Sequence, residues 1–326
     1  MRRRELLAGI GSGFLAWPSA GHAQQSTTKP RRVALLSGGP WRLPLLNAFL
    51  DQMRMMGWEQ GRNFVLDARH ADAKPEMFGV RAGEVVALSP DVIVAPNSQS
   101  VAAAIAHTVS IPIVMIDVSN PVEAGFVKSL ASSGSNVTGT TNQLKDVSSK
   151  HYELLREVRP GLERMGVIFT PSNAGSALGV HEASVEMRRL GITLIPLAFD
   201  RPSDLDGVSA MLVPDGPQAV VVHPTPVTIT NLAAIAKLAL ERRLPTVTAF
   251  RFMAQEGLLL SYGSDMPESW RRAAFYVDKL LRGESPSNLP IEQPTKFEFV
   301  INLRTARALG LTIPPTLLAR ADEVIE

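Results

Sequence analysis

Small polar side chains follow several short apolar runs of this sequence, at positions where a strand is expected to end. Asn97 and Ser98 follow one such run, Asp117 ends another, and His223 follows three valines. Together with the free N–H groups at a helix start, these side chains can hold the carboxylate and ammonium groups of a small molecule. The sequence has no HExxH spacing of metal-binding histidines, no Gly-x-Ser-x-Gly motif and no Walker loop. The chemistry favoured is therefore binding, and we expect no catalytic residue, metal or cofactor.

Each of these residues also has an ordinary structural role, and the sequence leaves both interpretations open. Ser98 can cap a helix, Asp117 can bind the backbone of its own turn, and His223 can be a buried histidine with satisfied hydrogen bonds. Ser172 and Asn173 repeat the polar pair at a helix start in the second half of the chain. All five are candidate ligand contacts.

Aromatic residues near strand ends are a second kind of candidate, because a ring can cover an apolar part of a ligand. Trp41 follows the Gly-Gly-Pro turn after the first apolar run, and packing against the next helix is its alternative role. Phe250 and Tyr262 lie at or near strand ends, Tyr262 close to an expected hinge. The full set of candidate ligand-binding residues is Ser37, Gly38, Trp41, Asn97, Ser98, Asp117, Asn142, Ser172, Asn173, His223, Phe250 and Tyr262.

The elements that position these residues form two series of strands and helices. Strands are predicted at 33–37, 64–68, 91–95, 111–117 and 136–141, and again at 165–169, 192–199, 219–223 and 245–249. Helices are predicted at 46–56, 77–88, 98–105, 122–130, 152–158, 180–190 and 231–240. Strands of the second series begin about 27 residues apart, which is the length that a strand, a crossover helix and two loops require. Pro196 indicates that its strand lies at a sheet edge or carries a bulge.

Two such series predict an α/β fold of two Rossmann-like lobes. Because strands and helices alternate, each lobe is expected to hold a parallel sheet covered by helices on both faces. Open parallel sheets bind ligands beyond the carboxyl ends of their strands, where the candidate residues lie. The sequence therefore places the binding site between two sheet edges.

The last part of the chain adds further elements. It contains an expected strand at 257–263, a helix that begins after Asp265, a strand at 296–301 and a short helix at 303–309. Since these elements return to earlier lobes, a hinge of several strands is expected. The predicted division is 31–141 with about 259–285 in an N-terminal lobe, and 142–258 with about 290–326 in a C-terminal lobe.

Residues 1–23 have the pattern of a cleaved export signal. Arg2, Arg3 and Arg4 precede an apolar stretch, and small residues stand before the expected cut after Ala23. The arginines followed by Glu-Leu-Leu also have the form of a twin-arginine signal. We therefore expect a periplasmic protein, and the absence of cysteine from the chain excludes disulfides and a lipobox anchor.

The composition is that of an ordinary folded protein, with 326 residues of which 45% are hydrophobic and 20% charged. The expected signal holds three arginines and one glutamate. The 33 basic and 31 acidic residues therefore become equal in number once the signal is removed. A neutral remainder argues against nucleic-acid binding through charge.

Stretches spread along the chain carry a resemblance to a known family. They are 33–37, 111–114, 136–139, 257–263, 293–302 and 306–315, and the last two form the most specific block. With them the chain resembles ABC-transporter substrate-binding proteins related to tryptophan- and tyrosine-binding lipoproteins. The chain departs from the family in lacking the lipobox cysteine, and in having Ile116 before Asp117 where the family often has Gly-Asp-Pro.

The resemblance implies a type I periplasmic-binding-protein fold that closes on a small molecule and delivers it to an ABC permease. The expected ligand is an amino acid or a related zwitterion or organic acid, with its anionic end at helix N-termini and its cationic end at Asp117. A monomer with no nucleic-acid partner is expected. The alternatives are a sensory binding module that docks on a receptor and an exported α/β hydrolase.

Overall fold

Two sheets organise the structure, a computed structural model that describes residues 29–40, 42–142 and 144–326. The first sheet has the strand order β11-β5-β4-β3-β1-β2, and its paired strands run parallel. Its strands are β1 (Arg31–Ser37), β2 (Phe64–His70), β3 (Val92–Ala95), β4 (Ile113–Val118), β5 (Val137–Thr141) and β11 (Ile291–Glu292).

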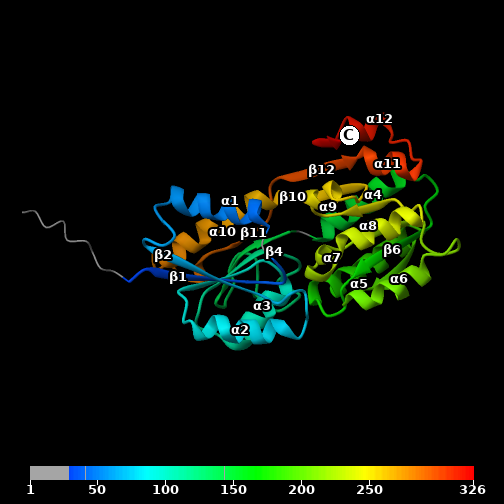
Figure 1. The fold of residues 1–326 in the computed structure, drawn as a ribbon. Coiled ribbons are helices and arrows are strands. Elements are labelled where there is room, and N and C mark those ends of the chain that lie inside the picture. Colours follow the sequence, from blue (N-terminus) through cyan, green and yellow to red (C-terminus); the bar gives the residue numbers. More distant parts are fainter. Residues whose placement is uncertain (1–28, 41, 143) are drawn as a thin grey trace, which may run out of the picture.

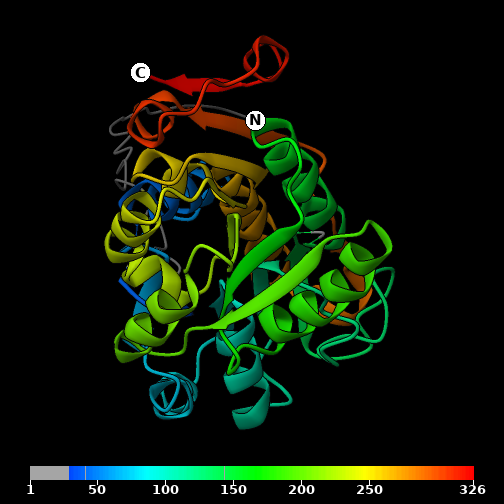
Figure 2. The same cartoon turned by 90° about the vertical axis from the view of Figure 1, so that its right-hand side faces the viewer.

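The second sheet has the strand order β13-β12-β10-β9-β8-β6-β7, in which β10 and β12 are antiparallel and the other pairs parallel. Pro196 lies in the edge strand β7, as its lack of an N–H donor predicts. Strand β13 forms the opposite edge, visible in red beyond β12 in Figure 2. The strands are β6 (Arg164–Phe169), β7 (Thr193–Ala198), β8 (Ala219–Val222), β9 (Thr246–Thr248), β10 (Leu260–Ser264), β12 (Phe297–Asn302) and β13 (Glu323–Ile325).

Helices cover both faces of the first sheet, and strand β1 shows why. Its side chains alternate, so that Val33 and Leu35 join one apolar cluster while Ala34 and Leu36 join the other. Both sets are buried, which requires a helical layer on each side. The first cluster holds α1 (Leu43–Met55) and α10 (Met266–Leu281), and the second holds α2 (Met77–Ala87) and α3 (Ser98–His107).

The second sheet is covered in the same way. In strand β8, Ala219 and Val221 pack on one face, and Val220 and Val222 on the other. One face carries α4 (Leu144–Val158), α5 (Ala174–Arg189), α11 (Leu303–Leu309) and α12 (Pro315–Leu318). The other carries α6 (Leu205–Met211), α7 (Pro226–Thr230), α8 (Leu232–Glu241) and α9 (Arg251–Gln255). The short helices η1 (Pro202–Asp204) and η2 (Pro286–Asn288) precede α6 and β11.

The chain passes between the two lobes three times, which confirms the expectation of a hinge with several strands. The crossings lie between β5 and α4, between β10 and α10, and between β11 and β12. Figure 1 shows the lobes side by side, with α1 and α10 in one and α5 to α9 in the other. We call these three segments the hinge.

The structure places two segments differently from the predicted division. Strand β10 was expected in the N-terminal lobe but is hydrogen-bonded within the seven-stranded sheet, so the crossing comes after Ser264. Strand β11 was expected in the C-terminal lobe but pairs with β5 of the six-stranded sheet. Both strands adjoin a crossing, and apolar content alone does not indicate which sheet such a strand joins.

The predicted helix at 122–130 is wrong, because this segment forms turns. Ala124 donates its N–H to the carbonyl of Asn120 over a single turn, but Gly125 then adopts a left-handed φ of +74°. A residue in that conformation ends a right-handed helix. The turn therefore stops before a second one can form.

The expected signal peptide at 1–23 and the candidate Trp41 lie outside the described residues. Among the residues that are described, none of the helices combines the length and apolar character needed to cross a bilayer.

Candidate ligand-binding cavity

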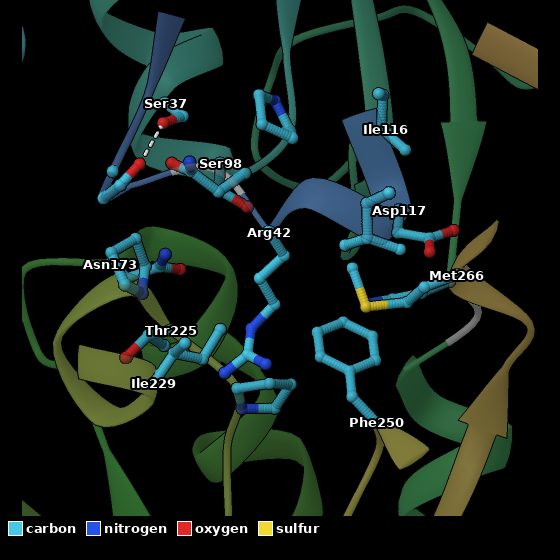
Figure 3. A pocket seen from close by; sticks show the side chains of 18 of the residues that line it. Ser37, Arg42, Ser98, Ile116, Asp117, Asn173, Thr225, Ile229, Phe250 and Met266 are labelled. Carbon is cyan, nitrogen blue, oxygen red and sulfur yellow. Dashed lines mark hydrogen bonds between the residues drawn. The ribbon is translucent and has the colours of Figure 1, made fainter. Parts of the chain in front are cut away.

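A cavity of about 400 Å³ lies between the lobes, where the carboxyl ends of strands from both sheets converge. Ser37, Asn97 and Asp117 reach it from the first lobe, and Asn173 and His223 from the second. A volume of this size falls in the range of small-molecule pockets in proteins. Figure 3 shows how the labelled side chains surround it.

Asp117 is a buried carboxylic acid at the hinge side of this cavity. Its backbone has a left-handed φ of +49°, beside an irregularity in the pairing of β4 with β5. One carboxylate oxygen accepts a hydrogen bond from Ser269 Oγ at 2.8 Å and the other from Ser264 Oγ at 3.2 Å. The backbone N–H of Asp117 donates to Thr140 Oγ1 at 3.0 Å. Strand β5 and the crossing between β10 and α10 therefore position this residue of β4.

Burial raises the pKa of the Asp117 carboxyl to about 7, against the opposing effect of the two serine hydroxyls. The negative charge of Asp265 adds to the rise of this pKa. The structure shows no cation bonded to Asp117 among the described residues. A positively charged group entering the cavity would favour the ionised form of this acid.

Two helices with an asparagine N-cap begin at the cavity, one from each lobe. In α3 the N-cap is Asn97, whose Oδ1 accepts a hydrogen bond from Ser100 N at 2.8 Å, so Ser98 is the first helical residue rather than the cap. In α5 the N-cap is Asn173, whose Oδ1 accepts from Ser176 N at 2.9 Å. Both asparagines also line the cavity, so capping and proximity to the cavity coexist at these positions.

His223 lines the cavity and contacts its own lobe through one of its two ring nitrogens. Its Nδ1 lies 3.1 Å from Ser176 Oγ, while its Nε2 is buried and has no hydrogen-bond partner. Burial, followed by the influence of His151, lowers the pKa of His223 to about 4, so the ring is neutral at neutral pH. A neutral ring can donate or accept at Nε2, depending on its tautomer.

Two further polar atoms, in residues that line the cavity, are buried without a hydrogen-bond partner. They are Oδ1 of Asn142, at the crossing after β5, and Nε1 of Trp270, in α10. Their residues are only 8% and 5% exposed. Buried polar groups are normally hydrogen-bonded, and leaving one unpaired costs on the order of 1–3 kcal/mol. Together with His223, three residues that line this one cavity therefore carry an unpaired polar atom.

Arg42 extends between the lobes at the same cavity. Its guanidinium lies 3.6 Å from the centre of the Phe252 ring and donates to Glu256 Oε1 at 2.8 Å. Both partners belong to the second lobe, whereas Arg42 precedes α1 of the first. In Figure 3 its side chain runs between Asn173 and Thr225 on one side of the view and Asp117 and Phe250 on the other.

The remaining lining is largely apolar. It includes the rings of Phe250, Phe252 and Trp270 and the side chains of Ile116 and Ile229. Such a lining accommodates a hydrophobic group, while the few polar atoms set its orientation. The cavity can therefore hold a small molecule that has an apolar body and polar or charged ends.

Nine of the candidate residues from the sequence line the cavity, and two other candidates, Ser172 and Tyr262, lie outside it. The nine are Ser37, Gly38, Asn97, Ser98, Asp117, Asn142, Asn173, His223 and Phe250. Ser172 is exposed and donates its hydroxyl to Asp200 Oδ1 at 2.7 Å. Tyr262 packs in the core of the second lobe, with its ring stacked on Phe297 at 5.7 Å.

Sequence reasoning missed Arg42 and Trp270. Trp270 was assigned to the apolar face of its helix, and it does pack in the first-lobe core. Trp270 also lines the cavity, because α10 returns to the first lobe. Arg42 stands next to a helix start, a position that carries no sequence signal for a cavity.

The chain matches known proteins over most of its length. A family model described as ABC transporter substrate binding protein matches residues 33–325. A protein from Clostridioides difficile (strain R20291) named tyrosine-binding protein is 27% identical over 264 residues, which is 81% of this chain and 75% of that protein.

Solved structures agree with this fold. A conserved domain protein from Vibrio cholerae is 26% identical with a TM-score of 0.83, covering 91% of this chain and 100% of that one. A structure titled as an ABC domain in complex with L-Trp, from Streptococcus pneumonia, also has a TM-score of 0.83, at 20% identity and the same coverage.

Proposed function

This chain belongs to the family of ABC transporter substrate-binding proteins, and on that premise we propose that it binds an amino acid with an apolar side chain between its lobes. The closed protein then delivers this amino acid, chemically unchanged, to an ABC permease. Residues 1–23 direct export, so that the protein works as a monomer in the periplasm.

One observation carries this proposal. The residues that line a largely apolar cavity include Asn142, Trp270 and His223, each with a buried polar atom that has no partner, and Asp117 with its carboxyl group. Such a set suits a ligand that offers both hydrogen-bond donors and acceptors around an apolar body. An amino acid has an ammonium group, a carboxylate and a side chain in this arrangement.

In the proposed complex, the ammonium group donates hydrogen bonds to Asp117 and Asn142, which lie on the hinge side. The carboxylate accepts from N–H groups at the starts of α3 and α5, where the helix dipoles favour negative charge. The side chain packs on the rings of Phe250 and Trp270. These contacts come from both lobes, so ligand binding favours the closed form.

The similar proteins suggest which amino acids to test first. One is named a tyrosine-binding protein and another was solved with L-Trp. The aromatic rings of the cavity in this chain are compatible with an aromatic ligand. L-tyrosine and L-tryptophan are therefore the leading ligands for this protein.

A thermal-shift screen of the twenty amino acids on residues 24–326 tests this proposal. A ligand that binds only the folded state raises the melting temperature by mass action. At a hundredfold excess over Kd the free energy of unfolding increases by about 2.7 kcal/mol. We expect L-tyrosine or L-tryptophan to give the largest rise. If none of the twenty changes the melting temperature, the proposed ligand class is wrong.

Mass spectrometry of the bound ligand after prolonged incubation distinguishes binding from turnover. Recovery of the unmodified amino acid agrees with a binding protein. Accumulation of a product supports a hydrolase instead.

A further inference from the structure

The two lobes touch each other around the rim of the cavity. Gln99 Nε2 donates to Ser172 Oγ at 3.2 Å across the gap, and Arg42 bonds Glu256 as described. These pairs join residues of the six-stranded lobe to residues of the seven-stranded lobe. The structure therefore shows the lobes in a closed arrangement.

Gly38 allows one of these contacts. A Cβ atom built on Gly38 would lie 2.2 Å from Cγ and 2.4 Å from Cβ of Pro226, which begins α7 in the opposite lobe. Real Cβ atoms do not approach carbon this closely, and a proline ring cannot turn away. The φ of Gly38 lies outside the left-handed region, so its own backbone does not require glycine.

Gly175 is the counterpart on the second lobe. It lies in the first turn of α5, and a Cβ atom there would lie 3.0 Å from Ser98 Oγ and 3.4 Å from Ser119 Cβ of the first lobe. Its φ is also outside the left-handed region. Each lobe thus presents one glycine against the other, and in both cases the opposing lobe leaves little or no room for a side chain.

We propose that Gly38 and Gly175 determine whether the lobes can close, because a side chain at either position holds the cavity open. In the open protein the two positions lie away from the opposite lobe. A methyl group at either position then clashes with no atom of that lobe. The two glycines are therefore positioning residues that act through the distance between lobes. Their role in ligand capture rests on the function proposed above.

The absence of cysteine from the chain allows closure to be measured without a ligand. The pair Gln99→Cys and Ser172→Cys places two thiols at the contact that forms on closure. A short bismaleimide then traps the closed form, and the rate of intramolecular cross-linking reports how often the lobes meet. This background variant is compared with the same variant carrying Gly38→Ala, Gly175→Ala or a control substitution.

The glycines provide their own controls. A Cβ on Gly207, in α6, would have no atom within 4 Å, and one on Gly39 would meet Thr230 Oγ1 at an ordinary 3.5 Å. We expect Gly38→Ala to slow cross-linking by about tenfold to a hundredfold, which corresponds to the range of overpacking penalties. We expect Gly175→Ala to slow it by about threefold to tenfold, and Gly39→Ala and Gly207→Ala to leave it within about twofold.

A second substitution identifies the contact responsible. Pro226→Gly removes the two proline atoms that a methyl group at position 38 would meet and leaves Phe78 Cζ of the first lobe, at 3.2 Å, as the nearest atom, so it should restore most of the cross-linking lost in Gly38→Ala. Circular dichroism and melting temperature confirm that each variant is folded. If Gly38→Ala disturbed only the first lobe, Pro226→Gly in the second lobe would not restore cross-linking.

The proposal is overturned if Gly38→Ala cross-links as fast as Gly207→Ala, if Pro226→Gly gives no rescue, or if the background variant never cross-links. None of these results depends on the identity of a ligand. Failure of the amino-acid screen therefore contradicts the proposed function, whereas failure of this experiment contradicts the role of the glycines.

Discussion

The two faces of the cavity carry titratable groups of opposite type. The first lobe contributes Asp117, whose pKa burial raises to about 7, and the second contributes His223, whose pKa burial lowers to about 4. The physical cause is the same for both, because burial disfavours the charged form of either group. Between about pH 4 and 7 both groups are therefore neutral in the empty cavity. Apart from Arg42, which is paired with Glu256, the charges at this site are expected to arrive with the ligand.

The two groups also differ in how they are held. Asp117 accepts hydrogen bonds from Ser264 and Ser269, which lie on either side of a hinge crossing. His223 contacts Ser176 within its own lobe. A charge that forms on Asp117 therefore acts directly on the hinge, whereas His223 bonds within its own lobe. We expect substitutions at Asp117 to have the larger effect on binding.

The largest effect is expected from Asp117→Asn. This change keeps the shape of the side chain but removes the carboxylate that pairs with the ammonium group in the proposed complex. Loss of one partner from a buried charge pair costs on the order of 3 kcal/mol, so affinity for L-tyrosine or L-tryptophan should fall at least about a hundredfold by isothermal titration calorimetry.

Asp265→Asn is the matched control for this measurement. Asp265 lies at the same crossing, pairs with Lys296 at 3.0 Å and does not line the cavity. Its substitution should change affinity by less than about threefold. Equal losses in both variants would contradict a specific role for Asp117.

The next effect is a dependence of affinity on pH. Because the pKa of Asp117 is about 7, the ionised fraction that pairs with an ammonium group grows as pH rises through 7. Affinity should increase about tenfold from pH 6 to pH 8 and then level off. The same titration of Asp117→Asn should be nearly flat, and an unchanged slope in that variant would assign the pH dependence to another group.

A smaller effect is expected from Trp270→Phe. The ring still fills its place in the first-lobe core, but the unpaired indole N–H is removed. If a ligand oxygen accepts from this N–H, affinity should fall by about threefold to tenfold, the value of one net hydrogen bond. Ser172→Ala is the comparison, since Ser172 lies outside the cavity and its loss should change affinity by less than about twofold. An unchanged affinity in Trp270→Phe would contradict a hydrogen bond from the Trp270 indole N–H to the ligand.

The smallest expected effects are opposite trends in stability with pH. The pKa of Asp117 lies above its ordinary value of 3.8, so its stabilisation is complete below about pH 4 and is lost as pH rises through 7. The pKa of His223 lies below its ordinary value of 6.5, so its stabilisation is present above about pH 6.5 and is lost as pH falls through 4. Both trends concern the ligand-free protein.

Melting temperatures of ligand-free variants separate these trends. At each pH the melting temperature of Asp117→Asn is compared with that of the unmodified protein. This difference should be a few degrees more positive at pH 8 than at pH 5. His223→Gln should lessen the fall in melting temperature between pH 6.5 and pH 4. Trends of the same sign in both variants would contradict the contrast between the two faces.

The sequence could predict the residues at strand ends because parallel sheets align those ends at one edge. Asn97, Asp117, Asn173 and His223 all follow this rule and line the cavity. Tyr262 also lies in a strand, but its ring packs in the core of the seven-stranded sheet. Alternation along a strand identifies a face without indicating whether that face meets a cavity or a core.

Residues on returning segments could not be predicted in this way. Trp270 reaches the cavity because the chain crosses to the first lobe after Ser264, and strand β11 pairs with β5 through only two residues. Such crossings depend on contacts between distant parts of the chain. The closure contact of Gly38 with Pro226 has the same origin, since neither residue has a local pattern that points to the other.

A crystal structure of the protein with the amino acid that most raises its melting temperature tests the central claim most directly. We predict ligand atoms at about 2.7–3.2 Å from Asn142 Oδ1, His223 Nε2 and Trp270 Nε1, with the ammonium group against Asp117. Electron density for the amino acid outside this cavity, or these three atoms bonded only to water in the complex, would contradict the account.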